Sequence, residues 1–104
     1  MARSDLSRAP THLSAEAKTW WGKFVAGWAL DDAACLIRQT ALEAFDRMRA
    51  AQAAIRRDGL TVNGRAHAAT IVERDSRLAM LRALRSLNLD VEPLRDKPGR
   101  PPGR

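Results

Sequence analysis

Basic residues are the groups in this sequence whose type and spacing suggest chemistry, because a guanidinium or ammonium group pairs well with phosphate. Arginine supplies fifteen of the eighteen basic residues in this chain of 104 residues, and the net charge is +6. One group lies towards the two ends: Arg3, Arg8, Arg95, Lys97, Arg100 and Arg104. A second group lies within one predicted helix: Arg74, Arg77, Arg82 and Arg85. The surplus charge favours a polyanionic partner, and either group is a candidate for that contact.

The final segment, residues 94–104, concentrates this charge. It holds four basic residues and one acidic residue, so it carries +3 of the net +6. Its Lys97-Pro98-Gly99-Arg100-Pro101 partly matches the Arg-Gly-Arg-Pro centre of the AT-hook, a minor-groove binding motif, with Pro98 in place of the first arginine. A solvated, disordered, proline-rich tail is the favoured interpretation of this segment, and the partial AT-hook is the alternative.

Residues that could perform catalysis do not form a recognisable set. The sequence has no Gly-x-x-x-x-Gly-Lys loop for nucleotide phosphates. His12 and His67 are far apart, and Cys35 is the only cysteine, so neither a zinc set nor an internal disulfide is expected. Asp75 has no second acidic partner for catalysis and is expected to pair with an arginine. We therefore expect a binding or assembly protein, with no catalytic residue, metal or cofactor.

The element expected to organise these residues is a long helix over residues 32–57, which contains neither proline nor glycine. An aspartate at its start and Gly59 after its end are suitable caps. Apolar residues at alternating steps of three and four form a narrow seam: Ala34, Ile37, Ala41, Ala44, Met48, Ala51 and Ile55. Because most of them are alanines, a partner helix can approach closely, and a helical hairpin is predicted.

A second line of residues follows the same helix about a third of a turn from the seam. It comprises Arg38, Leu42, Phe45, Arg49 and Arg56. This line is either a solvated face or a contact with another subunit. Leu42 and Phe45 favour the subunit contact, because apolar groups gathered on an outer face often mark an interface.

The remaining elements flank the long helix. A short helix over about residues 14–28 carries all three tryptophans, which at this spacing are expected in a core rather than stacked on bases. Residues 59–67 contain Asn63-Gly64, the preferred pair for a tight hairpin turn, and predict a small loop or β-hairpin. A third helix is expected over about residues 68–87.

The third helix has apolar residues on two sides, so it needs two partners. One is the long helix. The other is either the tryptophan-bearing helix or a neighbouring subunit, through Ile71, Leu78 and Leu81. Together with Leu42 and Phe45, these residues form the predicted oligomer interface.

The sequence thus predicts an all-α chain with one helical domain over residues 13–93, a flexible arm over 1–12 and a disordered basic tail over 94–104. No apolar run is long enough to cross a membrane, and no signal-peptide pattern is present at the start. A single cysteine suits a reduced compartment, so a cytoplasmic protein is expected.

The order of short motifs resembles the small terminase subunits of tailed bacteriophages over about residues 12–93. The matching motifs are Leu13-Ser14-x-Glu16-Ala17, Trp20-Trp21, Leu30-Asp31, Gly59-Leu60-Thr61-Val62, His67-x-Ala69, Glu73-Arg74-Asp75-Ser76-Arg77 and Leu84-Arg85-x-Leu87-x-Leu89-Asp90-Val91-Glu92-Pro93. One departure is Ala68, where that family usually has a proline before the last helix. Proline in the first turn favours a helix without being essential to it.

The resemblance implies a ring-forming helical protein in the cytoplasm of a bacterial host. Its implied partners are viral double-stranded DNA, further copies of itself, and a large subunit that carries the ATPase and nuclease of genome packaging. The resemblance does not assign the DNA contact to either end of the chain or to the third helix. A small helical DNA-binding regulator and an adaptor that binds only protein are the alternative functions.

Overall fold

The computed structural model describes residues 8–89 and consists of three α-helices with a two-stranded antiparallel hairpin between the second and third. The helices are α1 (Ala15–Gly27), α2 (Asp32–Asp58) and α3 (Ala69–Leu87). The strands are β1 (Thr61–Val62) and β2 (Arg65–Ala66), with Thr61 paired to Ala66 and Val62 paired to Arg65. The predicted all-α architecture and the order of its elements are therefore confirmed.

Polar caps determine where the first two helices begin. The Ser14 hydroxyl accepts a hydrogen bond from the Ala17 N–H at 3.0 Å, and the Asp31 carboxylate accepts one from the Ala34 N–H at 2.8 Å. Each satisfies a backbone donor that the first turn leaves without a partner. At the other end of α2, Gly59 has a φ of +89°, a conformation that glycine adopts without strain.

The third helix begins differently, because Ala68 at its N-cap offers no side-chain acceptor. The His67 ring takes over this role: its Nδ1 accepts a hydrogen bond from the Ala69 N–H at 2.9 Å. The helix starts at Ala69, one residue after the predicted start, and ends at Leu87 as predicted. Its C-cap, Asn88, has the left-handed conformation, with φ +56° and ψ +42°. A histidine thus caps the helix that lacks the proline.

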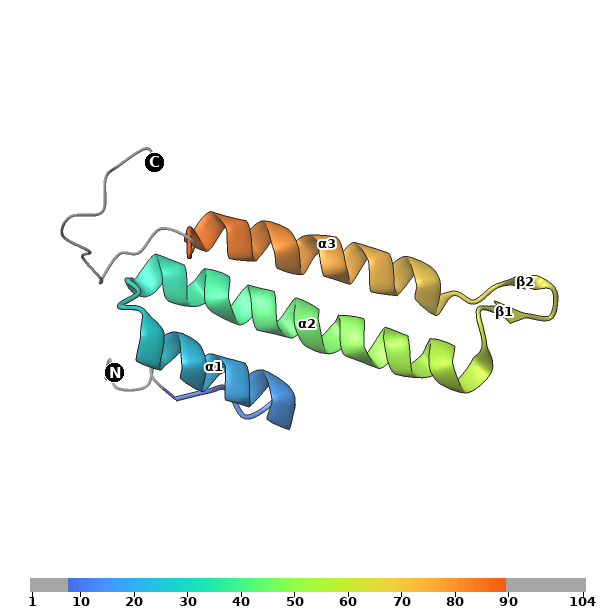
Figure 1. Ribbon diagram of the computed structural model, residues 1–104, viewed down its shortest axis with the longest axis horizontal. Coiled ribbons are helices and arrows are strands. Elements are labelled where there is room, and N and C mark those ends of the chain that lie inside the picture. Colours follow the sequence, from blue (N-terminus) through green and yellow to red (C-terminus); the bar gives the residue numbers. More distant parts are fainter. Residues whose placement is uncertain (1–7, 90–104) are drawn as a thin grey trace, which may run out of the picture.

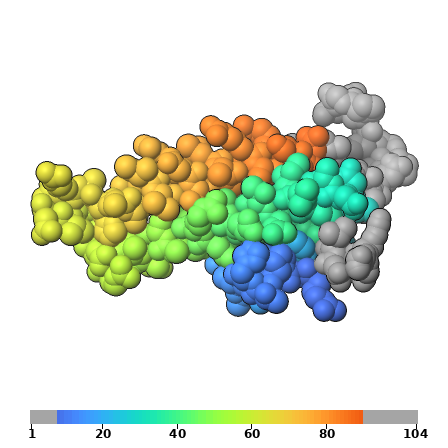
Figure 2. Space-filling view, turned by 180° about the vertical axis from the view of Figure 1, so that it is seen from behind, coloured from blue at the N-terminus to red at the C-terminus, as the bar shows by residue number. Residues whose placement is uncertain are grey.

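The three helices lie side by side, with α2 between α1 and α3 (Figure 1). Both neighbours run antiparallel to α2; α3 follows nearly its whole length, whereas α1 covers only its first half (Figure 1). This arrangement follows from the connections, because the short link after α1 turns the chain back at once and the hairpin after α2 does the same. The β1–β2 hairpin extends beyond the paired helices, as the view from behind also shows (Figure 2).

The alanine seam of α2 packs as predicted. Ala41, Ala44, Met48 and Ala51 are buried, which allows α3 to approach α2 closely. A cluster of buried apolar residues joins α1 to α2 and comprises Leu13, Ala17, Trp21, Phe24, Leu42, Phe45 and Met48. Met80, Leu84 and Leu89 pack against this cluster from α3 and the residues after it, so the three helices share one core.

The two apolar residues of the second line on α2 do not face outwards, although Arg49 and Arg56 of the same line are exposed. Leu42 and Phe45 are only 4% and 8% exposed, because α1 of the same chain covers them. The premise that these two residues form an outer face available to another subunit is therefore wrong. Leu42 and Phe45 are buried because they lie next to the seam that α3 covers. The helix that carries the tryptophans, α1, packs its own apolar side against them.

Candidate interfaces for nucleic acid and for further subunits

Most of the basic residues predicted near the chain ends lie outside the described residues. These are Arg3, Arg95, Lys97, Arg100 and Arg104. Arg8 is described and is exposed to solvent. The assignment of DNA binding to the two ends therefore stays a prediction.

One side of α3 carries an apolar strip that residues 8–89 leave exposed. Ile71, Leu78 and Leu81 are 56%, 41% and 44% exposed. Residues seven and three positions apart in a helix lie close to one face, so the three side chains form a continuous line. Their exposure agrees with the prediction that this side of α3 needs a second partner.

The four arginines of α3 flank this apolar strip, but local carboxylates neutralise two of them. Arg77 pairs with Glu73 one turn earlier, with 3.0 Å between Nη2 and Oε1, and Arg74 pairs with Asp75 at 3.4 Å. The carboxylate of Glu73 also accepts a hydrogen bond from Gln52 of α2 at 3.1 Å. Hydrogen bonds from Arg77 and then Gln52 lower the pKa of Glu73, so this carboxylate stays ionised.

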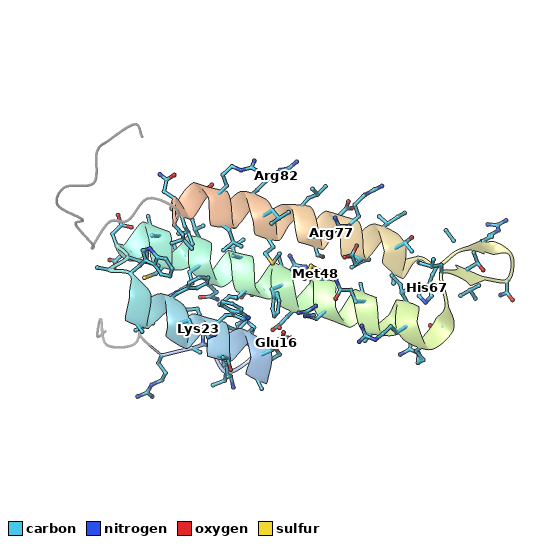
Figure 3. All side chains as sticks on the ribbon, viewed as in Figure 1. Glu16, Lys23, Met48, His67, Arg77 and Arg82 are labelled. Atoms are coloured by element: carbon cyan, nitrogen blue, oxygen red, sulfur yellow. The ribbon has the colours of Figure 1, made fainter. Side chains whose placement is uncertain are left out.

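Arg82 and Arg85 differ from these two. Neither side chain has a carboxylate partner among residues 8–89. Figure 3 shows Arg82 on the side of α3 that faces away from α2. Of the four predicted candidates on this helix, Arg82 and Arg85 are therefore the ones most available to an external anion.

An apolar strip flanked by arginines suits a contact between proteins. Arginine is enriched at such interfaces, while lysine, aspartate and glutamate are depleted. A phosphate backbone would require the leucines to face charged oxygens and water. The strip on α3 therefore favours a protein surface, with the arginines at its rim.

An open groove lies between α1 and α3, with α2 as its floor. It has a volume of about 700 Å³ and is lined mainly by apolar side chains, among them Trp20, Phe24, Leu42, Phe45 and Leu84. The Arg49 side chain at its edge pairs with Glu16 of α1 at 3.1 Å. No pattern in the sequence indicates this groove, because three separate elements form it.

Arg38 is a residue whose role the sequence did not indicate. It is only 2% exposed, and its guanidinium carbon lies 3.8 Å from the centre of the Trp21 ring. Burial lowers the pKa of Arg38. The flat guanidinium covers the indole, so Trp21 is part of the α1–α2 core and does not serve as a stacking platform for bases.

The base of the β1–β2 hairpin is fixed by a small polar network. The Asp58 carboxylate accepts hydrogen bonds from Arg57 at 2.9 Å and from His67 Nε2 at 2.8 Å. Because His67 Nδ1 accepts from the Ala69 N–H, its proton lies on Nε2 in the neutral ring. Arg57 first, and His67 second, lower the pKa of Asp58 to about 2. The network couples the end of α2 to the start of α3.

Within residues 8–89 no three histidine, cysteine or acidic side chains gather where they could hold one metal ion. In the same part of the chain, no helix is long and apolar enough to span a membrane. Asp75 is exposed and paired with Arg74, as the sequence predicted for a structural ion pair.

Comparisons with known proteins found no matching family model, no matching curated protein and no matching solved structure.

Proposed function

We propose that this chain is the small subunit of a phage terminase. In this role it assembles into a closed ring, binds viral double-stranded DNA, and recruits or regulates the large subunit that carries the ATPase and nuclease. The resemblance of the motifs over residues 12–93 supports the proposal, as does the net charge of +6.

The observation that carries the proposal is the apolar strip on α3. The chain already buries one core between its helices, yet Ile71, Leu78 and Leu81 stay exposed along one face. Contiguous apolar surface of this kind is typical of a site for another protein. A ring supplies that protein as a further copy, and the strip is where we expect the copies to meet.

A small DNA-binding regulator is supported less well. A helix-turn-helix unit needs a short turn between two helices that cross steeply, so that the second helix enters the major groove. Here α2 and α3 run alongside each other and are joined by a hairpin (Figure 1). An adaptor that binds only protein would use the same α3 strip, and DNA binding distinguishes it from the proposed function.

Native mass spectrometry of the full chain tests assembly. We expect a closed oligomer larger than a tetramer, built from chains of 11.5 kDa. Leu78→Asp should dissociate it, because a charge placed in a dry contact loses its hydration. Leu36→Asp is the matched control, since Leu36 is 69% exposed on α2 and lies outside the strip. A single-chain mass for the unmodified protein would contradict the ring.

Retention on duplex DNA tests the second part of the proposal. Binding should weaken linearly in log affinity as log salt rises. The purified chain should hydrolyse no nucleotide and cut no DNA by itself, but should stimulate the large subunit. If the oligomer does not bind DNA even at low salt, the result would instead support the adaptor that binds only protein.

A further inference from the structure

The hairpin between α2 and α3 is the element that the proposed function leaves without a role. It projects past the ends of both helices (Figures 1 and 2), and every residue from Leu60 to Ala66 is exposed. An isolated two-stranded hairpin is at best marginally stable in water. A hairpin of this size therefore needs contacts at its base to stay ordered. Its projection beyond the helices leaves it accessible to a partner.

The local support is present. The His67 N–H donates to the Leu60 carbonyl at 2.8 Å and closes the hairpin at its base. The Asp58–His67–Ala69 network then fixes that base to both helices. At the tip, Asn63 and Gly64 both have positive φ, 54° and 78°, as the tight primed turn requires. The hairpin is thus presented in a defined direction.

The charges of this end favour a polyanion. Arg56 and Arg65 are exposed, and neither has a carboxylate partner among residues 8–89. Asp58, the carboxylate at the base of the hairpin, is already engaged by Arg57 and His67. Among the described residues, the hairpin thus presents one uncompensated arginine, Arg65, and the adjacent end of α2 presents another, Arg56. On α3, Arg82 and Arg85 share this property, whereas Arg74 and Arg77 do not.

The shape of the hairpin selects among polyanions. Val62 and Arg65 are directly opposite each other in the ladder, so their side chains share one face of the ribbon. The major groove of B-form DNA is wide enough to admit a two-stranded β-ribbon. It also offers thymine methyl groups to an apolar side chain and guanine acceptors to an arginine.

We propose that the β1–β2 hairpin enters the major groove of double-stranded DNA, with Arg65 contacting phosphate or guanine and Val62 contacting the groove wall. This inference rests on the proposed function for DNA binding itself. It adds the element and the groove that make the contact.

The test compares Arg65→Ala with Arg47→Ala in the full chain on a mixed-sequence duplex of about 30 base pairs, long enough to expose several groove turns. Both variants remove one basic side chain, and Arg47 lies on α2 away from the hairpin. Arg65→Ala should weaken binding about tenfold more than Arg47→Ala, and should lower the salt slope by about 0.9 for each phosphate that the protein no longer neutralises. Arg65→Lys should restore the slope.

Methylation of guanine N7 reports the groove directly, since N7 lies in the major groove. The unmodified protein should protect N7, and Arg65→Ala should lose that protection while keeping its circular dichroism. If the unmodified protein fails to bind the duplex, the proposed function fails. If it binds and the two arginine variants behave alike, the hairpin inference alone is overturned. Val62→Asp gives a further test. If this variant changed the native mass and kept N7 protection, the hairpin would be a contact between subunits and the DNA inference would be overturned.

Discussion

Phe45 distinguishes the arrangement expected from the sequence from the one in the structure. If Phe45 lay on an outer face of α2, as the sequence suggested, its replacement would disturb assembly and leave the single chain folded. In the structure it is 8% exposed within the α1–α2 cluster. Phe45→Ala should therefore destabilise each chain, whatever its oligomeric state.

The size of the effect follows from the surroundings of the ring. Replacing a buried phenylalanine by alanine costs about 3–5 kcal/mol, depending on the cavity left behind. Phe45 also lines the open groove, so water and neighbouring side chains can fill the space and the cost should lie near the lower value. The guanidinium of Arg49 lies 5.0 Å from the ring centre, and its attraction to the ring is worth about 0.5–1 kcal/mol at an exposed site. We expect a decrease of about 3 kcal/mol in the free energy of unfolding, since these contributions overlap.

Urea denaturation followed by tryptophan fluorescence is the assay, because all three tryptophans lie in α1 or directly after it. The midpoint should fall with little change in the denaturant slope. Leu78→Ala is the control, since Leu78 is 41% exposed and its truncation should change stability by about 0.5 kcal/mol or less in a single chain. Each variant is measured at several protein concentrations to separate folding from assembly. If Phe45→Ala altered only the native mass and left unfolding unchanged, the packing of Phe45 between α1 and α2 would be refuted.

Three further predictions concern single side chains and the tail. Arg38→Ala should lower the free energy of unfolding by about 2 kcal/mol, because it removes the packing against Trp21. Arg38→Met should lower it less, because methionine keeps most of the side-chain volume. Urea denaturation measures both variants. The pKa of Asp58 is depressed to about 2, so its stabilising contribution is complete above the ordinary value of about 3.9 and is lost as pH falls through 2. The melting temperature of Asp58→Asn should therefore vary less between pH 4 and pH 2 than that of the unmodified chain. Deleting residues 95–104 removes four cations, and should weaken DNA binding and its salt dependence while leaving the native mass unchanged; equal affinity and slope would exclude the tail from the contact.

Local features of the structure were predictable because their causes are local. Ser14 and Asp31 are polar residues just before helical segments, and Asn63-Gly64 is a pair that tolerates two positive φ values. The alanine seam of α2 also predicted a close helical partner, because small residues leave room for one. In each case the relevant atoms lie within a few residues of one another.

Features that depend on the choice of partner were not predictable in the same way. Helical spacing places Leu42 and Phe45 on one line but does not say which helix covers that line. The burial of Arg38 is not evident from its own helix, because the ring that covers it belongs to Trp21 on another helix. The His67 cap of α3 is equally hidden, because the sequence offers no usual capping residue there. Position 68 did give one indication. It holds neither a proline nor a polar N-cap residue, so a neighbouring side chain had to cap the helix.

The distribution of charge in space also changes how the net +6 should be interpreted. The sequence places four arginines on one side of α3, yet Glu73 and Asp75 neutralise two of them, Arg77 and Arg74, on that same helix. The charge that remains, on Arg82 and Arg85, borders the apolar strip. Neither water nor a phosphate group interacts favourably with those apolar side chains. The hairpin has fewer arginines, but no described acid compensates Arg65. Electrostatic attraction depends on uncompensated charge rather than on the number of arginines, but Arg82 and Arg85 of α3 are uncompensated as well as Arg65. The two surfaces differ in their surroundings. The α3 arginines border exposed apolar side chains, which favour a protein partner, whereas Arg65 lies on a narrow projecting ribbon, and this is why we propose the DNA contact there.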